Sequence, residues 1–414
     1  MALKTLLHSE DGSTLAVLAL AFPLLIGSAG FAIDMFQWTS AKSALQEVAD
    51  QAAIAGVSAI VQGSSPEVAV SELVARSQAL EPSTSTQVKV APDSRPKDPF
   101  AVAVRLSAPA RMSFSSLFLK EPFSITTEAT ASLVENGEFC LLALGRDDTG
   151  IAIQPGGHLE AECGLASNSS AAAAIQVTAG GKLTAPRAVA FGGIAGWENP
   201  ETSVARSFGL RQKDPYANAA PPPVPSTGCP NITANPNNNG EGTLKLKPGC
   251  YGNMMLNGTV ALQPGEYILN RGNFIVGPMG HVSCKGCTFI LTSRDAASNP
   301  GSVGKVRIDP KANVKLTAPA DGPDPGLLFY QDPRAGREIL GQESRIGGDG
   351  FSTIEGVIYM PAQTIRVDGQ GGVNLSCSRL LGRALIIEGR VVIGKDCLGV
   401  DQMKIAGTEV RLVG

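Results

Sequence analysis

The residues best suited to chemistry are His281, Cys284 and Cys287, which follow one another at three-residue steps. Imidazole and thiolate groups bind zinc, and a Cys-x-x-Cys pair also exchanges disulfides in redox enzymes. The alternative is a plain disulfide across the Lys285-Gly286 turn. We favour the disulfide, because the sequence has no second Cys-x-x-Cys pair and no thioredoxin-like βαβ pattern around this one. No metal ion or other cofactor is therefore predicted.

Carboxylates are the second candidate for chemistry. A glycoside hydrolase needs two of them flanking the sugar bond. The best local groups are Asp309, Asp321 with Asp324, and Asp332. They lie in Pro/Gly loops, where aspartate is common because it stabilises turns, and no basic catalytic residue recurs beside them. We therefore predict that the protein is not an enzyme, and we keep a polysaccharide-acting enzyme as an alternative.

The cysteines all follow residue 139, which indicates disulfide use in an oxidising compartment. The disulfide candidates are Cys140, Cys163, Cys229, Cys250, Cys284, Cys287, Cys377 and Cys397. Connectivity cannot be deduced from the sequence alone. The spacing between neighbours favours three pairs that would each close a loop of about one structural repeat. They are Cys140 with Cys163, Cys229 with Cys250, and Cys377 with Cys397.

Composition limits both the partners and the fold class. The 414 residues include 34 Lys+Arg and 37 Asp+Glu, a net charge of −3, so no nucleic-acid partner is predicted. Charged residues make up only 17%, and 47 Gly and 28 Pro disfavour a long helical bundle, while 43% hydrophobic residues exclude a disordered chain. The expected fold class is mainly β, with many short strands joined by Gly/Pro turns.

The first element that must position these residues is an uncharged run from Gly12 to Ile33. At about 1.5 Å per residue it covers the ~30 Å hydrocarbon core of a membrane. Pro23 inside the run is tolerated in a membrane helix. A cleaved secretory signal with its apolar stretch at Leu15–Ile26 is the alternative. We favour a retained transmembrane helix, because the apolar stretch continues to Ile33 and merges with a helix.

A helical stalk is predicted directly after this run, from Phe36 to Val61. Apolar and mostly small side chains recur along it at three- and four-residue steps. They are Leu45, Val48, Ala52, Ala55 and Ala59. Such a stripe can pack closely against a partner helix or lie on its own domain, and the spacing leaves both interpretations open.

An ordered series of Pro, Gly, Asp, Trp, Leu-Gln and Ala-Asp features runs through this N-terminal region. It comprises Ser13–Gly27, Gly30–Asp34, Trp38 and Leu45–Ala53. The series resembles the N-terminal segment of the TadG-like (TadE/TadG-like) proteins, which serve the tight-adherence (Flp) pilus machinery of bacteria. The resemblance implies a single-pass anchor in the bacterial inner membrane, with the C-terminal bulk periplasmic or extracellular. It also implies other pilus-assembly proteins as partners through the N-terminal helix. Some members carry a von Willebrand A domain, whose Asp-x-Ser-x-Ser metal motif does not occur in this sequence.

The rest of the chain divides by its patterning. Residues 63–138, after the anchor and stalk at 1–62, predict a small α+β spacer with a helix at Val68–Leu80 and strands at Val88–Val90, Ala101–Leu106 and Ile125–Val134. In residues 139–414 similar phrases recur, and short runs such as Lys305–Asp309 and Thr364–Asp368 alternate apolar with charged residues.

These repeats predict a right-handed parallel β-helix-like solenoid over 139–414, with a β-sandwich as the alternative. A Pro/Asn-rich excursion at 211–240 is too polar and too rich in proline to pack, so we expect it to be exposed. The predicted function is that of a structural, non-catalytic, membrane-anchored component in assembly or anchoring of the tight-adherence pilus. The β-region would offer a surface to an envelope or extracellular ligand. A β-helical surface adhesin is the other alternative.

Overall fold

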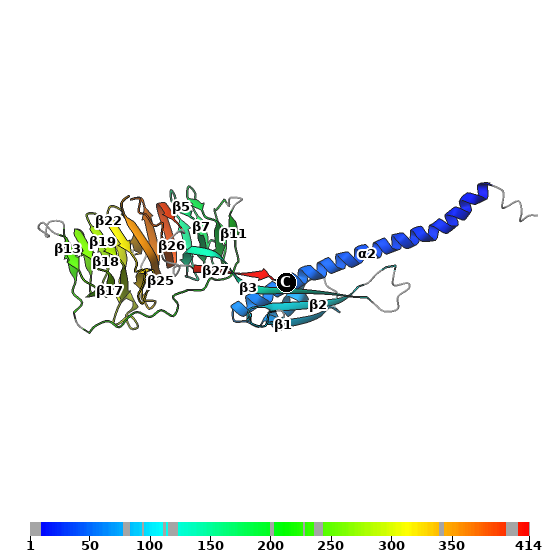
Figure 1. The fold of residues 1–414 in the computed structure, drawn as a ribbon, viewed down its shortest axis with the longest axis horizontal. Helices are drawn as coiled ribbons and strands as arrows, with labels where there is room; N and C mark the ends of the chain where they lie inside the picture. Colours follow the sequence, from blue (N-terminus) through cyan, green and yellow to red (C-terminus); the bar gives the residue numbers. More distant parts are fainter. Residues whose placement is uncertain are drawn as a thin grey trace, which may run out of the picture. The chain divides into compact units, whose positions relative to one another are not determined.

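The computed structural model describes residues 10–77, 83–92, 95–110, 113–114, 123–198, 203–226, 228–235, 243–338, 343–394 and 405–413. The chain forms two compact units. Unit 1 comprises residues 1–134 and 410–414, and unit 2 comprises Glu135–Glu409. Figure 1 shows the long helix of unit 1 in blue and the strands of unit 2 from cyan to orange.

Unit 1 contains two helices and an antiparallel sheet. The helices are α2 (Glu10–Val61), with Pro23 inside it, and α3 (Pro66–Arg76). The sheet consists of β1 (Ser85–Val90), β2 (Val102–Ala110) and β3 (Phe123–Ala143), and β2 pairs with both of the others. These elements agree with the predicted long apolar helix, short helix and three strands. The short helix begins two residues before the predicted Val68–Leu80 and ends at Arg76.

The start of α3 follows from its sequence. Ser65 lies in extended backbone and its hydroxyl accepts a hydrogen bond from Val68 N at 3.3 Å. Pro66 occupies the first turn, where a missing N–H costs nothing. Val70 then turns inward and is fully buried in the core between the helices and the sheet.

Unit 2 is made of short strands that pair in parallel with strands about three places further along the chain. The strands form three ladders, a ladder being a series of strands in which each pairs with the next. We number the ladders and give the strands of each in spatial order. Ladder 1 consists of β12 (Ile232–Ala234), β15 (Met254–Leu256), β18 (Phe274–Val276), β21 (Val306–Ile308), β24 (Ser344–Ile346), β25 (Thr353–Gly369), β26 (Ser378–Ile393), β4 (Ile151–Ile153), β7 (Ile175–Val177) and β10 (Ile194–Ala195).

The other two ladders repeat this arrangement. Ladder 2 has two separate parts. One contains β13 (Leu244–Leu246), β16 (Thr259–Leu262), β19 (His281–Lys285), β22 (Asn313–Thr317) and β25, and the other contains β26, β5 (His158–Ala161) and β8 (Lys182–Thr184). Ladder 3 contains β14 (Gly249–Tyr251), β17 (Gly265–Asn270), β20 (Cys287–Thr292), β23 (Leu327–Gln331), β25, β26, β3, β6 (Gly164–Ser167), β9 (Arg187–Ala190) and β11 (Val204–Arg206). A further strand, β27 (Ile405–Leu412), runs from unit 2 into unit 1, and η2 (Pro300–Ser302) is a short 3₁₀ turn.

The order of the strands in space differs from their order in the chain. The first strands of unit 2 lie in the middle of the ladders, because β26 pairs with β25 on one side and with β3, β4 and β5 on the other. Figure 1 shows this as a jump from the orange of β26 to the cyan-green of β5 and β7. We call the contact between β26 and β3, β4 and β5 the seam.

An ion pair with a buried arginine lies at the seam. The Arg379 side chain on β26 is 2% exposed and donates to Glu138 Oε1 on β3 at 2.6 Å. It also donates to the carbonyl oxygens of Ser378 and Gly394, both at 3.1 Å. The pair joins residues that are far apart in the sequence but adjacent across the seam.

Residues 207–231 return the chain from β11 at one end of the ladders to β12 at the other. Just over half of the described residues in this connection are exposed, and most of the others are half-buried. Gln212, however, is 4% exposed, and its backbone exchanges two hydrogen bonds with the side chain of Asn168, at 2.7 and 2.9 Å. The Tyr216 ring lies 5.1 Å from that of Tyr359 on β25. The expectation that this polar segment cannot pack is therefore wrong for its first part, because amide and phenol groups supply hydrogen bonds as well as contact.

Unit 2 combines apolar stacking in its interior with a polar corner nearer the surface. The Phe289 ring lies 4.6 Å from Phe274 and 5.1 Å from Phe329, and these side chains are fully buried. At one corner, Asn253 N donates to Asn231 Oδ1 at 2.7 Å, and Asn273 N donates to Asn253 Oδ1 at 2.9 Å. Each amide thus satisfies a backbone donor at the turn of the next repeat.

Candidate functional sites

The Cys-x-x-Cys motif forms the disulfide that the sequence analysis favoured over a metal or redox centre. Cys284 is bonded to Cys287 across the Lys285-Gly286 turn, and Gly286 has a φ of +80°, which favours glycine. Since both sulfurs are bonded to each other, they offer no thiolates to a metal ion. No cluster of three or more metal ligands occurs among the described residues.

The other cysteines pair largely as the spacing suggested. Cys140 is bonded to Cys163, and Cys229 to Cys250. Cys377 is also disulfide-bonded, and Cys397, the residue predicted to pair with it, lies outside the described residues.

Two of the predicted carboxylates, Asp309 and Asp332, are engaged in structural contacts. Asp332 is fully buried and accepts hydrogen bonds from Thr292 Oγ1 at 2.7 Å and from the Arg334 guanidinium at 2.6 and 2.9 Å. Burial opposes its ionisation, but these hydrogen bonds outweigh burial and lower its pKa. Asp309 accepts from Lys311 N at 2.9 Å in a turn, Asp321 is exposed, and Asp324 is half-buried. This arrangement places Asp309 and Asp332 in different hydrogen-bond networks.

A groove on the outer surface of ladder 1 was not among the predicted sites. It consists of two open pockets that share Ile275 and Arg307, with volumes of about 650 Å³ and about 470 Å³. Arg271, Lys305 and Arg307 line the larger pocket, and no carboxylate lines it. We call Arg271, Lys305, Arg307 and Arg345 together the basic groove.

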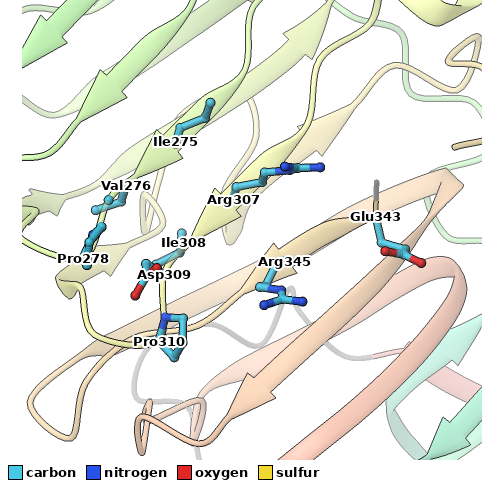
Figure 2. A pocket seen from close by; sticks show the side chains of 10 residues that line it. Ile275, Val276, Pro278, Arg307, Ile308, Asp309, Pro310, Glu343 and Arg345 are labelled. Atoms are coloured by element: carbon cyan, nitrogen blue, oxygen red, sulfur yellow. The ribbon is translucent and has the colours of Figure 1, made fainter. Parts of the chain in front are cut away.

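The smaller pocket has mixed charge. Figure 2 shows Arg307 and Arg345 on adjacent strands, with Asp309 at the turn that follows Arg307 and Glu343 beyond Arg345. Glu343 also pairs with Arg366 at 3.4 Å.

Strand register places the arginines in one row. Arg307 on β21 lies opposite Arg345 on β24, which lies opposite Arg366 on β25. Burial and the neighbouring Arg307 lower the pKa of Lys305. The sequence carried a signal for this row, because the runs Lys305–Asp309 and Thr364–Asp368 both have an arginine at their third position.

Helix α2 forms the other candidate site. Its outer half, from Val17 to Phe36, leaves large apolar side chains uncovered. They are Val17, Leu18, Leu20, Phe22, Leu24, Leu25, Ile26, Phe31, Ile33, Met35 and Phe36, with exposed fractions of 44–76%. The helix is long and apolar enough to cross a membrane, and it contains Gly12, Pro23 and Ile33, which mark the predicted span. An uncovered apolar surface of this size indicates an apolar environment or partner.

Polar contacts begin where the apolar run ends. Asp34 is 2% exposed, and its Oδ1 accepts a hydrogen bond from Phe114 N at 2.9 Å. One turn later, Gln37 Nε2 donates to Ser113 Oγ at 2.8 Å. Gly30 lies against the Phe114 ring, where a Cβ atom would come within 2.5 Å of ring carbons. This part of α2 is therefore held by unit 1 itself.

Residues 12–59 match the family described as "Putative Flp pilus-assembly TadE/G-like". The matched residues lie within α2, so the match covers the predicted anchor and stalk and leaves unit 2 outside it. No curated protein and no solved structure matches the chain.

Within the TadE/G-like segment, the predicted packing stripe faces its own unit. Leu45, Val48, Ala52 and Ala59 are 0–6% exposed, and Ala55 is half-buried. The core around the buried part of this stripe includes Val102 and Leu106 of β2. Of the two interpretations left open by the spacing, the structure places these residues on their own domain, so they are not free to contact a partner helix.

Proposed function

We propose that this protein is a structural, non-catalytic component of the tight-adherence (Flp) pilus apparatus, anchored in the bacterial inner membrane by a single pass of α2. The proposal rests on the overlap between the family match and the uncovered apolar part of α2. The TadE/G-like match at 12–59 includes the part of α2 whose apolar side chains are uncovered, from Val17 to Phe36. A helix with such a surface gains free energy by entering lipid.

The bulk of the chain, in this proposal, lies outside the cytoplasm. Its support is the placement of all eight cysteines after residue 139 and the disulfides in unit 2. Disulfides persist in the periplasm and at the cell surface, where the surroundings are oxidising.

Unit 2, we further propose, is a right-handed β-helix-like solenoid that presents a contact surface. The parallel pairing of successive repeats supports this reading, whereas a β-sandwich is built from antiparallel strands. Other pilus-assembly proteins would meet the uncovered outer half of α2, since the stripe from Leu45 to Ala59 is already packed.

A non-catalytic role is supported by the engagement of Asp309 in a turn and of Asp332 in an ion pair. The alternative, a polysaccharide-acting enzyme, requires that the protein convert a polysaccharide into products. An assay of the purified full chain on envelope polysaccharides tests it, and turnover that Asp309→Asn abolishes would replace our proposal.

The anchoring proposal is tested by alkaline extraction of bacterial membranes. Leu20 and Leu24, which are 76% and 75% exposed, are changed together to Asp. We expect the wild-type chain to stay in the membrane pellet and the variant to be lost from it, together with pilus assembly. The matched control changes two exposed apolar residues of unit 2, Val204 and Phe208, to Asp, and should retain both properties.

The mature N-terminus separates a retained anchor from a cleaved signal. Intact-mass analysis of the chain from bacterial membranes should show residues 12–33 still present. A mature protein trimmed near Phe31 and free in solution would overturn the anchoring proposal.

A further inference from the structure

We propose that the basic groove on ladder 1 binds a linear polysaccharide that carries carboxylate groups. The proposal concerns unit 2 alone and does not depend on the proposed role in pilus assembly. It rests on three features, namely the register of the strands under the groove, the charge of the groove and its shape.

The register gives a row of cations that crosses the strands. Arg307, Arg345 and Arg366 lie opposite one another on three adjacent strands. Neighbouring strands are about 4.7–4.9 Å apart. A polymer lying along the ladder, across the strands, therefore meets the exposed guanidinium groups of Arg307 and Arg345 on successive strands.

The charges along the row are balanced at one end and unbalanced at the other. Arg345 pairs with Asp368 at 3.6 Å, and Arg366 pairs with Glu343 and Glu388. Arg307 is exposed, and no ion pair joins it to an acidic side chain among the described residues. Its planar guanidinium can bind a carboxylate through two parallel hydrogen bonds.

The position of Lys305 strengthens the case for an anion. Lys305 and Arg307 line the same pocket. Burial and then Arg307 lower the pKa of the Lys305 ammonium group, and this outweighs the opposite effect of Glu338 and Glu343. A carboxylate placed between them would relieve this repulsion of like charges. Arg271 also lines this pocket, and it pairs with Asp295.

The shape of the groove favours a sugar chain over a peptide. An extended peptide repeats its side chains on one face about every 6.6–6.8 Å, which does not fit the strand spacing. The backbone groups of β21 already pair with β18 and β24 on its two sides, so this strand has no free edge for an added peptide strand. The half-buried Ile275 lies between the two pockets, where its apolar surface suits the C–H face of a sugar ring.

The proposal is tested by fluorescence anisotropy with the full chain in lipid nanodiscs. The probe is a labelled oligomer of α-1,4-linked galacturonate, and its fully methyl-esterified form is the ligand control, with the same rings and no charge. We expect the acidic oligomer to bind, the esterified form to bind at least about tenfold more weakly, and added salt to weaken binding.

Two substitutions locate the site. Arg307→Gln should weaken binding about tenfold or more, because it removes a charge-assisted bidentate contact. Arg345→Gln should have a smaller effect, because Arg345 is shared with Asp368. The matched control is Lys315→Gln, which removes an exposed cation from β22 in ladder 2 and should leave binding unchanged. Circular dichroism should give the same thermal midpoint for all these proteins.

Three results would overturn the proposal. One is the absence of binding by the wild-type chain at millimolar oligomer. Another is equal binding by the Arg307→Gln and Lys315→Gln variants, which would place the site elsewhere. The last is tighter binding of inorganic polyphosphate than of galacturonate, which would assign the groove to phosphate polymers.

Discussion

The two units differ in how they hold their cores. Unit 1 buries apolar side chains of α2 and α3 against an antiparallel sheet, and its core cluster consists of alanine, valine, leucine and isoleucine. Unit 2 adds disulfides, a stack of phenylalanine rings and hydrogen-bonded asparagines to its apolar interior. All eight cysteines and all five tyrosines of the chain lie in unit 2. The units should therefore respond differently to a buried charge, to a reductant and to alkaline pH.

The largest effect should come from placing a charge in the core of unit 1. Ala52 is fully buried, so Ala52→Asp should destabilise unit 1 by about 3–5 kcal/mol, the usual cost of an uncompensated buried charge. Limited proteolysis of the full chain should then show cleavage within residues 83–134, with unit 2 still protected.

Its control is Ile54→Asp, which adds the same charge at a position that is 37% exposed on the same helix. Equal protease resistance of the Ala52→Asp and wild-type chains would show that the core does not depend on the α2 contact.

The next effect should be confined to unit 2. Changing Cys229 and Cys250 together to Ser removes a bond that closes a loop of 21 residues, which stabilises a protein by about 3 kcal/mol. Hydrogen exchange followed by mass spectrometry should show faster exchange in β14 and β17. Peptides of unit 1 should exchange as before, and faster exchange there would contradict independent units.

Alkaline pH should also separate the units. Burial raises the pKa of Tyr267 to about 12, and its hydroxyl donates to the carbonyl oxygens of Gln263 and Leu246 at 2.8 and 3.1 Å. A raised folded-state pKa means that this stability is complete below about pH 10 and is lost as the pH rises to about 12.

The free energy of unfolding of unit 2 should fall by on the order of 2 kcal/mol over this range. Near-ultraviolet circular dichroism measures it. In the variant Tyr267→Phe, part of the loss between pH 10 and 12 should disappear. The same pH dependence in the variant and in the wild type would show that other groups cause it.

The smallest effect concerns the cap of α3. Ser65→Ala removes the acceptor for Val68 N, which should cost about 1 kcal/mol and act only on unit 1. Exchange of the amides at the start of α3 should become faster, and Ser65→Asp should restore protection. No change in either variant would mean that tertiary packing alone holds the helix end.

The sequence predicted the elements whose signals are local. The apolar run from Gly12 to Ile33, the alternation in Lys305–Asp309 and the neighbour pairs of cysteines each lie within one or two structural repeats. The contact of Arg379 with Glu138 joins residues 241 positions apart, and no local pattern predicts it. The row from Arg307 to Arg366 was visible only as similar short runs, since strand register determines whether such residues meet.

The seam has a mechanical consequence. The chain enters unit 2 at Glu135 and leaves it at Glu409, and its first and last long strands, β3 and β26, are hydrogen-bonded neighbours. Tension applied through these two ends would act on the Asn136–Glu409 hydrogen bond and the Arg187–Glu409 ion pair as well as on the seam and its Arg379–Glu138 pair. Strands such as β15, β16 and β17 take no part in these contacts and would keep their pairing under such a load.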